Sequence, residues 1–536
     1  MSRARPHPSG AHPKPPMSPL RLLLPALGLT AVALASQDPA PSPSPDRDAP
    51  AARPAIADEA PGAGRELADP TLAALVRHVD EARMQAEVRA LVALGPRMGG
   101  TASGHAAADH LAAAFREAGL EVEVREDPEA WRHQEASWSL TYRILGPDGE
   151  AGEPVPLESA WPWGFSPAAA GSAPLGTDAV DGGAVLTDGR PRFLRRGPTP
   201  AVALTDGLVT LDGAYPRIYQ QRSGDANPFP IFGLNTADGA ALRAELAAGR
   251  AVELQYELLS TIERARPRTV IARVPARAGA APGFLLYCAH GDSDAGGPGA
   301  DDNASGTAVV LEMARAWAAA LEAGAERPPR ELRFAVWGSE IHSTRDWLAE
   351  QRAAEQDATG PPLLGVINYD QAGYGSGADQ LNIEPDDLPA NRVMIERILA
   401  VLAEAEGAAG FPTRWATNKS LGGTDSYVFS GSRHFRDEGR PALTLFTSAW
   451  DKPDEQPRTA GMAGESWSDR DVVNVDYDVY YHSAGDTPEN TTDKEPWNMG
   501  WCARVGLVGG LAWLEQLEAE DAAEAAGEPP VAPDGD

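Results

Sequence analysis

Histidine and carboxylate side chains lie close together in one stretch of the sequence, residues 288–306, which reads CAHGDSDAGGPGADDNASG. His290 is followed closely by Asp292 and, after a glycine-rich loop, by Asp302. Imidazole and carboxylate groups are ligands that zinc favours, and a further acid beside a ligating histidine can fix the orientation of its ring. The stretch therefore predicts a metal site. A polar turn between a buried strand and a helix capped by Asp or Asn would explain the same residues without a metal.

Four apolar runs have the length and composition of buried strands. Helical runs separate several of them, and this alternation predicts a largely parallel sheet with helices on both faces. Ligands bind at the carboxyl ends of the strands in such sheets. The four runs are 284–289, 332–337, 363–368 and 442–446.

Other predicted strands also end in side chains that could bind a metal. ELRFAVWGS leads to Glu340, GVINY leads to Asp370, and the segment YYHSAGDT supplies His482. Each of these residues alone would be an ordinary surface acid or histidine. The carboxyl ends of parallel strands share one edge of a sheet. The position of these residues after predicted strands therefore favours a single site that includes His290.

Composition narrows the class of protein. A chain of 536 residues is long enough for a catalytic domain with an insertion. The 77 acidic residues outnumber the 46 basic ones, and the resulting net charge of −31 repels phosphate backbones, which argues against a nucleic-acid partner. Two cysteines in apolar contexts, Cys288 and Cys502, are too few for a disulfide scaffold.

The N-terminal segment predicts export. Residues 1–35 contain a basic flank, a short apolar core and a small-residue ending, which together are typical of a secretory signal peptide. No later stretch reaches about 18 uninterrupted apolar residues, so we expect no membrane span after cleavage and a secreted or periplasmic protein. An uncleaved or lipidated anchor is the alternative. Residues 36–66, rich in Pro, Ala and Asp, predict a disordered linker.

The rest of the sequence predicts two further structural regions. Residues 71–118 carry apolar residues at helical spacing, interrupted at GPRMGG. Residues 131–260 consist of short strand-like runs separated by Gly, Pro and Asp, which predict a mainly β domain with one helix at 236–248. We expect that domain to shield the site and shape substrate access, or to be purely structural. The acidic tail at 518–536 predicts disorder.

The order and spacing of the motifs resemble the zinc exopeptidases with a co-catalytic two-metal site, a family that includes secreted bacterial aminopeptidases and glutamate carboxypeptidases. The most specific pieces are HGDS, GADDNASG, FAVWGSE, INYDQAG and YYHSAGDT, within residues 71–517. The resemblance implies a doubly wound α/β peptidase domain with a largely parallel mixed sheet, formed by residues 67–130 and 261–517. It also makes the β domain at 131–260 similar to a protease-associated domain.

The resemblance implies zinc as the cofactor, with two ions expected. His290 and Asp370 would bind one ion, and His482 would bind the other. Asp302 would bridge both ions.

Two more acids would serve the chemistry. Asp292 would orient His290, and Glu340 would be the general base that takes a proton from the metal-activated water as it attacks a peptide carbonyl. The implied function is hydrolysis of terminal bonds in peptide substrates. Aminopeptidase activity is favoured over carboxypeptidase activity by its prevalence in the family, and nothing in the sequence indicates the preferred terminal residue or the oligomeric state.

One position departs from the family pattern. The family has two adjacent glutamates, the first as base and the second as metal ligand, whereas this chain has Glu340 followed by Ile341. Isoleucine cannot coordinate metal, so the second position would keep Asp302 and His482, and His342 is a candidate replacement ligand. The alternatives are a site with one zinc, a glutaminyl-cyclase-like enzyme with a single zinc, or a metal-deficient binding protein on the same fold.

Two further polar residues are candidates for binding substrate. Tyr481, beside His482, could donate a hydrogen bond to the developing oxyanion. Asp425, in GGTDSYVFSG, resembles a family position that faces the substrate or supports the metal ligands, although a turn residue would explain it equally well.

Overall fold

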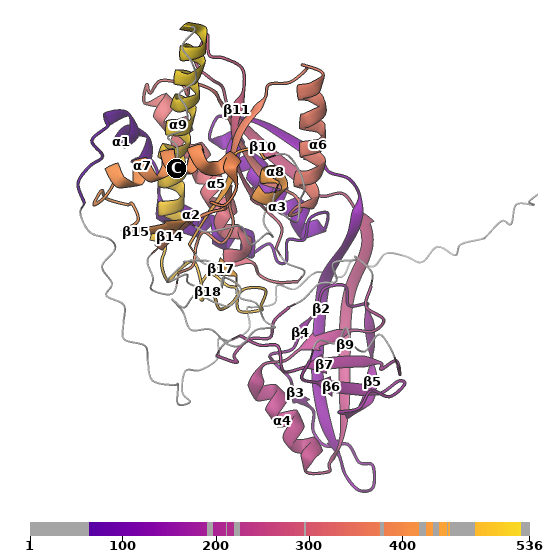
Figure 1. The fold of residues 1–536 in the computed structure, drawn as a ribbon. Helices are drawn as coiled ribbons and strands as arrows, with labels where there is room; N and C mark the ends of the chain where they lie inside the picture. Colours follow the sequence, from indigo (N-terminus) through magenta and orange to yellow (C-terminus); the bar gives the residue numbers. More distant parts are fainter. Residues whose placement is uncertain are drawn as a thin grey trace, which may run out of the picture. The chain divides into compact units, whose positions relative to one another are not determined.

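The computed structural model describes a defined part of the chain (Figure 1). The predicted signal peptide and most of the predicted linker lie outside this part. Within it, no helix is both long enough and apolar enough to cross a membrane. The described residues all belong to one compact unit, Ala57–Asp536. They are 64–189, 197–210, 212–218, 226–293, 296–375, 380–417, 425–431, 439–447, 449–450 and 477–526.

An eight-stranded mixed sheet forms the centre of the α/β domain, in the order β1-β10-β12-β11-β13-β16-β14-β15 (Figure 1). Strands β12, β11, β13 and β16 are parallel neighbours, and the antiparallel pairings lie toward the two sides. The predicted α/β class with a largely parallel mixed sheet is confirmed. The strands are β1 Glu121–Glu126, β10 Arg268–Val274, β11 Phe284–His290, β12 Glu331–Trp337, β13 Leu363–Tyr369, β14 Gln380–Glu384, β15 Arg414–Thr417 and β16 Ala442–Phe446.

Helices cover both faces of this sheet, because its central strands are apolar on both sides. Along β11, Leu285 and Tyr287 join the core on one face, while Leu286 and Cys288 join the core on the other. Side chains of α1, α2, α3, α5, α7 and α9 contribute to the first core, and those of α6 and α8 contribute to the second. The helices are α1 Pro70–Val76, α2 Glu81–Val92, α3 Ala102–Glu117, α5 Gly306–Glu322, α6 His342–Gln356, α7 Arg392–Glu404, α8 Ser426–Ser430 and α9 Trp497–Ala526.

A second eight-stranded sheet, called the β lobe here (residues 130–265), is inserted between β1 and β10. These two strands are antiparallel neighbours whose ends meet at Glu126 and Arg268, so the chain leaves and re-enters at one point. The β lobe has its own hydrophobic core. Its elements are β2 Ala130–Leu145, β3 Val155–Pro156, β4 Trp161–Pro162, β5 Ala169–Gly176, β6 Ala184–Thr187, β7 Val202–Thr205, β8 Ile231–Gly233, α4 Thr236–Ala247 and β9 Ala251–Ala265.

The C-terminal helix differs from the expectation of a disordered tail from 518 onward. Helix α9 continues to Ala526. Arg277 forms an ion pair with Glu518, and Arg330 forms one with Asp521. These contacts attach the last turns of the helix to the α/β domain, so the prediction of disorder is wrong for 518–526, while 527–536 lies outside the described residues.

Candidate metal centre

Five predicted site residues lie at one edge of the α/β sheet. His290 ends β11, Asp370 directly follows β13, and Glu340 follows β12 in the turn before α6. Asp302 lies in the irregular turn Ala300–Ser305 that begins α5. His482 comes from a separate loop after the short strand β18 (Tyr477–Asp478), which pairs with β17 (Ala449–Trp450).

The donor atoms of these residues converge. The Nε2 atom of His290 lies 3.3 Å from Oδ1 of Asp302 and 3.5 Å from Oδ1 of Asp370. The other oxygen of Asp302, Oδ2, lies 3.1 Å from Nε2 of His482. One ligand atom from each of His290, Glu340 and Asp370 lies within 4.8 Å of the others. Asp302 thus faces a histidine with each of its two oxygens, as a bridging carboxylate must.

The acids of the site are crowded in a buried space. Burial raises the pKa of Asp370, with attraction to His290 opposing the shift and the charge of Asp302 adding to it. Burial also raises the pKa of Glu340 well above its ordinary value, against attraction to His290 and with the repulsion of nearby carboxylates. Burial raises the pKa of Asp302 as well, but hydrogen bonds from His290 and His482 reverse the shift and lower it. A divalent cation would offset this crowding, and the donor set is one that zinc favours.

Asp292 contacts both His290 and Glu340. The Nδ1 atom of His290 lies 3.0 Å from the main-chain oxygen of Asp292 and 3.4 Å from its Oδ1. The same Oδ1 accepts the backbone N–H of Glu340 at 2.9 Å. The main chain of Asp292 therefore fixes the imidazole ring and directs Nε2 to the site, while the side chain fixes the turn that carries Glu340.

The turn after Glu340 has an unusual backbone. Ile341 has φ 59° and ψ −41°, and the N–H of His342 donates to the carbonyl of Glu340, so the three residues form a γ-turn. A β-branched residue rarely adopts positive φ. The N–H of Ile341 donates to Oδ1 of Asp425 at 2.7 Å, and the hydroxyl of Thr344 donates to the same oxygen. Buried Asp425 thus holds the γ-turn in place.

Asp425 also differs electrostatically from an ordinary turn residue. Burial raises its pKa to about 6, although attraction to His290 and the hydrogen bonds from Thr344 and Ile341 oppose the shift. Its described side-chain hydrogen bonds come from Ile341 in the γ-turn and from Thr344 in the first turn of α6.

The other two predicted residues have different surroundings. The Nε2 atom of His342 lies 3.1 Å from the carbonyl oxygen of Pro128, so this nitrogen points to the chain between β1 and β2. The structure does not bring it to Asp302, because the γ-turn starts α6 at His342. The ring of Tyr481 stacks on that of His482, with centroids 3.7 Å apart.

Arg97 is a site residue that the sequence reasoning missed. It lies between α2 and α3, is 1% exposed, and donates to the carbonyl oxygens of Pro298 at 2.7 Å and Gly299 at 2.6 Å. Its guanidinium therefore fixes the loop that leads to Asp302. Burial lowers its pKa to about 10 against the attraction of nearby carboxylates, so the side chain stays charged at neutral pH. The motif GPRMGG indicated only a helix break.

Asp486 is a second missed residue. It follows His482 in the same loop, and its carboxylate accepts the backbone N–H groups of Asp301 at 2.8 Å and Asp302 at 3.1 Å. Burial raises its pKa to about 6, opposed by these hydrogen bonds. Its presence in YYHSAGDT was the available signal, because a buried acid beside a ligand loop commonly supports the ligands.

Fold and site together define an α/β domain with a cluster of histidine and carboxylate side chains at the carboxyl edge of its sheet. Residues 269–505 match the model of Peptidase family M28. The match includes all five converging residues.

Two relatives illustrate the similarity of this sequence to those of known proteins. The chain is 28% identical over 248 residues to an "Aminopeptidase" of Pseudomonas aeruginosa (strain UCBPP-PA14), covering 44% of this chain and 40% of the relative. It is 26% identical over 273 residues to a "Probable leucine aminopeptidase 2" of Trichophyton verrucosum (strain HKI 0517), covering 50% of this chain and 49% of the relative. The chain thus spans less than half the length of these relatives.

Solved structures share the fold. A Peptidase M28 precursor from Shewanella amazonensis SB2B superimposes with a TM-score of 0.53 at 17% identity, covering 83% of this chain and 95% of the other. BSAP, a zinc aminopeptidase from Bacillus subtilis, gives a TM-score of 0.50 at 19% identity, covering 82% of this chain and 95% of the other. At these identities the likeness shows the fold alone.

Proposed function

We propose that this chain is a zinc-dependent exopeptidase, and specifically an aminopeptidase that removes residues from the amino ends of peptides. The observation that carries the proposal is the convergence of two histidines and three carboxylates at one sheet edge. The M28 match supports peptide hydrolysis, and the names of the relatives favour the amino end over the carboxyl end.

The proposed metal ligands divide into two groups. His290 and Asp370 would hold one zinc ion, His482 would hold the other, and Asp302 would contact both. Zinc bound there polarises a carbonyl group and lowers the pKa of a water molecule. Because Ile341 occupies a usual ligand position, the second ion would have fewer protein ligands than the first.

Glu340 is the proposed general base. Its backbone is fixed through Asp292, and its carboxylate faces His290 and Asp370. A carboxylate in this position would first accept a proton from the attacking water and then donate it to the leaving amine. We propose that Asp425 acts through the Glu340 turn and that Tyr481 contacts the substrate.

The experiment compares peptides whose ends are free or blocked, using the purified full chain. We expect release of free amino acids from peptides with a free amino end, no release when that end is acetylated, and unchanged release when the carboxyl end is amidated. Zinc per chain is measured on the same samples by mass spectrometry. Absence of bound zinc together with absence of release after zinc is supplied would contradict the proposal.

We also propose that residues 1–35 are a signal peptide, that the protein is secreted or periplasmic, and that the β lobe is a protease-associated domain. The basic and apolar pattern of residues 21–35 supports the first two points. Expression of the full chain in a bacterial host, followed by N-terminal sequencing of the exported protein, tests them. A mature protein that keeps residues 1–35 in the cytoplasm would contradict them.

A further inference from the structure

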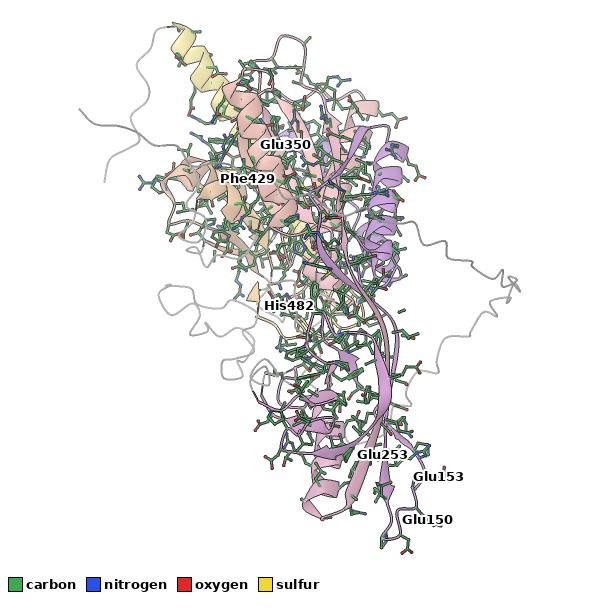
Figure 2. The ribbon with its side chains drawn as sticks, turned by 90° about the vertical axis from the view of Figure 1, so that its right-hand side faces the viewer. Glu150, Glu153, Glu253, Glu350, Phe429 and His482 are labelled. Atoms are coloured by element: carbon green, nitrogen blue, oxygen red, sulfur yellow. The ribbon has the colours of Figure 1, made fainter. Side chains whose placement is uncertain are left out.

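A short segment of the β lobe, residues 215–218, pairs with the loop that carries His482. The N–H of Ile218 donates to the carbonyl of His482 at 2.7 Å, and the N–H of Ala484 donates to the carbonyl of Pro216 at 3.2 Å. Arg217 and Ser483 form the antiparallel bridge between these bonds. Figure 2 labels His482 in this region, where the α/β domain meets the β lobe. The main chain at His482 is thus bonded directly to the lobe.

The side chain of Arg217 extends this contact to the residues before His482. It is 1% exposed, and its guanidinium donates to the carbonyl oxygens of Tyr481 and, at 3.4 Å, Val479. Both carbonyl groups would lose a hydrogen-bond donor if this side chain were removed. Arg217 therefore contributes to holding the backbone on the amino side of His482.

Aromatic side chains also pack between the β lobe and the loop that carries His482. The ring of Tyr215 meets the ring of Tyr480 edge-on, with centroids 6.0 Å apart. Gly485 lies against Tyr215 so closely that an added Cβ would be 2.6 Å from its ring. The loop is consequently packed against the lobe on both sides of His482.

The 215–218 segment is itself fixed within the β lobe. The N–H of Arg217 donates to the carbonyl of Leu208 at 2.9 Å, and the N–H of Thr210 donates to the carbonyl of Tyr215 at 2.9 Å. Displacement of the segment would break these bonds. The segment therefore keeps the His482 loop in a fixed position relative to the β lobe.

His482 needs such support. Its φ of 49° lies in the left-handed region, which non-glycine residues adopt only where the surrounding structure enforces it. Its side chain is 26% exposed, against 5% for His290, so its own packing restrains it less. Its Nε2 atom nevertheless lies 3.1 Å from Asp302.

We propose that the β lobe positions His482 for the second metal ion and that Arg217 is the main positioning residue. The inference rests on the proposed two-zinc site. Because Ile341 removes a usual ligand from the second position, a small displacement of His482 would release that ion. The β lobe then acts in metal retention, a role distinct from shielding the site or shaping substrate access.

The test compares Arg217→Met with Arg243→Met in the full chain. Arg243 lies in α4 of the same lobe and pairs with Asp206, so the control removes an arginine without touching the His482 loop. After equilibration at a series of buffered zinc concentrations, we expect the wild type and the control to keep two zinc ions. We expect Arg217→Met to keep one, with an affinity for the second ion lower by about 10–100-fold. Arg217→Lys, which keeps the charge, should restore part of the affinity.

Zinc retention by a folded Arg217→Met variant equal to that of the wild type would overturn the inference. Because loss of a buried arginine can prevent folding, Tyr215→Ala provides a second variant that trims only the aromatic contact. Tyr215→Ala should also lower the affinity for the second ion. If Arg217→Met does not fold, zinc retention by Tyr215→Ala equal to that of the wild type would overturn the inference. A wild type that binds fewer than two ions would instead overturn the two-zinc proposal, so the two failures are distinguishable.

Discussion

The two halves of the candidate metal centre are built differently. His290 and Asp370 lie at the ends of neighbouring parallel strands, and their side chains are 5% and 8% exposed. His482 lies in a loop, has a positive φ and is more exposed. The comparison teaches that one half of the site is fixed by the sheet of the α/β domain, while the other half depends on contacts with an inserted lobe.

The difference has a physical basis in hydrogen bonding. Strand β11 pairs with β12 as far as His290 and with β13 as far as Cys288, so His290 ends a strand that is held on both sides. Around His482, the described main-chain bonds to distant parts of the chain are those with residues 215–218 and, four residues further on, the bond from the N–H of Ala300 to the carbonyl of Asp486. Local opening requires less free energy where fewer such bonds must break. The second half should therefore open first.

Asp302→Asn should have the largest effect, because Asp302 faces the histidines of both halves. Replacing one carboxylate oxygen by an amide nitrogen removes the charge that we propose bridges the two ions, so we expect less than one zinc per chain and hydrolysis at background level. Zinc content and peptide release measure both. The matched control is Asp109→Asn in α3, because the Asp109 side chain is exposed and its carboxylate is in an ion pair 3.3 Å from Arg268. Two retained zinc ions in Asp302→Asn would show that the halves do not share this residue.

Glu340→Gln should separate chemistry from metal binding. Loss of the base should lower the rate of hydrolysis by about 10²–10⁴-fold, the usual contribution of general base catalysis. Zinc content should stay at the wild-type value, because the other four residues keep their donor atoms. Loss of zinc in this variant would instead identify Glu340 as a ligand.

Arg97→Met should destabilise the half that the sheet fixes, because the guanidinium also donates to the carbonyl of Gly291, next to His290, at 3.4 Å. Removing a fully buried charge that lies beside carboxylates costs about 3–5 kcal/mol, and the carbonyl groups of Pro298 and Gly299 lose their donor. Urea unfolding measures the loss. Arg217→Met in the β lobe should lose zinc with a smaller change in unfolding free energy than Arg97→Met. That result would support the difference between the two halves. Equal losses for both variants would remove it.

Glu355 in α6 forms an ion pair outside both halves of the site, and its contribution to the free energy of unfolding can be measured. Burial raises its pKa, but hydrogen bonds from Arg440, Gln351 and the N–H of Leu363 outweigh this effect and lower the pKa to about 2. A carboxyl with a depressed folded pKa stabilises the protein above its unfolded pKa of about 4.3, and this contribution is lost as the pH falls toward 2.

Glu355→Gln should therefore lower the unfolding free energy by about 1 kcal/mol above pH 5, after allowance for solvent screening. The difference from the wild type should shrink as the pH falls from 5 to 2. Urea unfolding across this range checks the trend. A difference that does not depend on pH would mean that the charge of Glu355 is not responsible.

Several elements could be predicted because their signals are local. The apolar run at 284–289 predicted β11, which extends one residue further, to His290. The strand ends indicated His290, Glu340 and Asp370 as candidates, since parallel strands present their carboxyl ends at one edge. The direction of the His342 ring was not predictable, because it depends on a γ-turn at Ile341 and on a carbonyl at Pro128. Order in 518–526 likewise depends on arginines far away in the chain.

From the sequence by itself the α/β class could be determined, and the insertion and the candidate metal ligands could be predicted, because strand periodicity and side-chain chemistry are local properties. Only the tertiary structure decided which residues hold that set in place. Arg97 and Arg217 lie in segments without a metal-binding motif, and their partners are main-chain carbonyl groups, which carry no sequence signal. Such contacts form only when distant segments are folded together, and for that reason the support of His482 by the β lobe appears only in the structure.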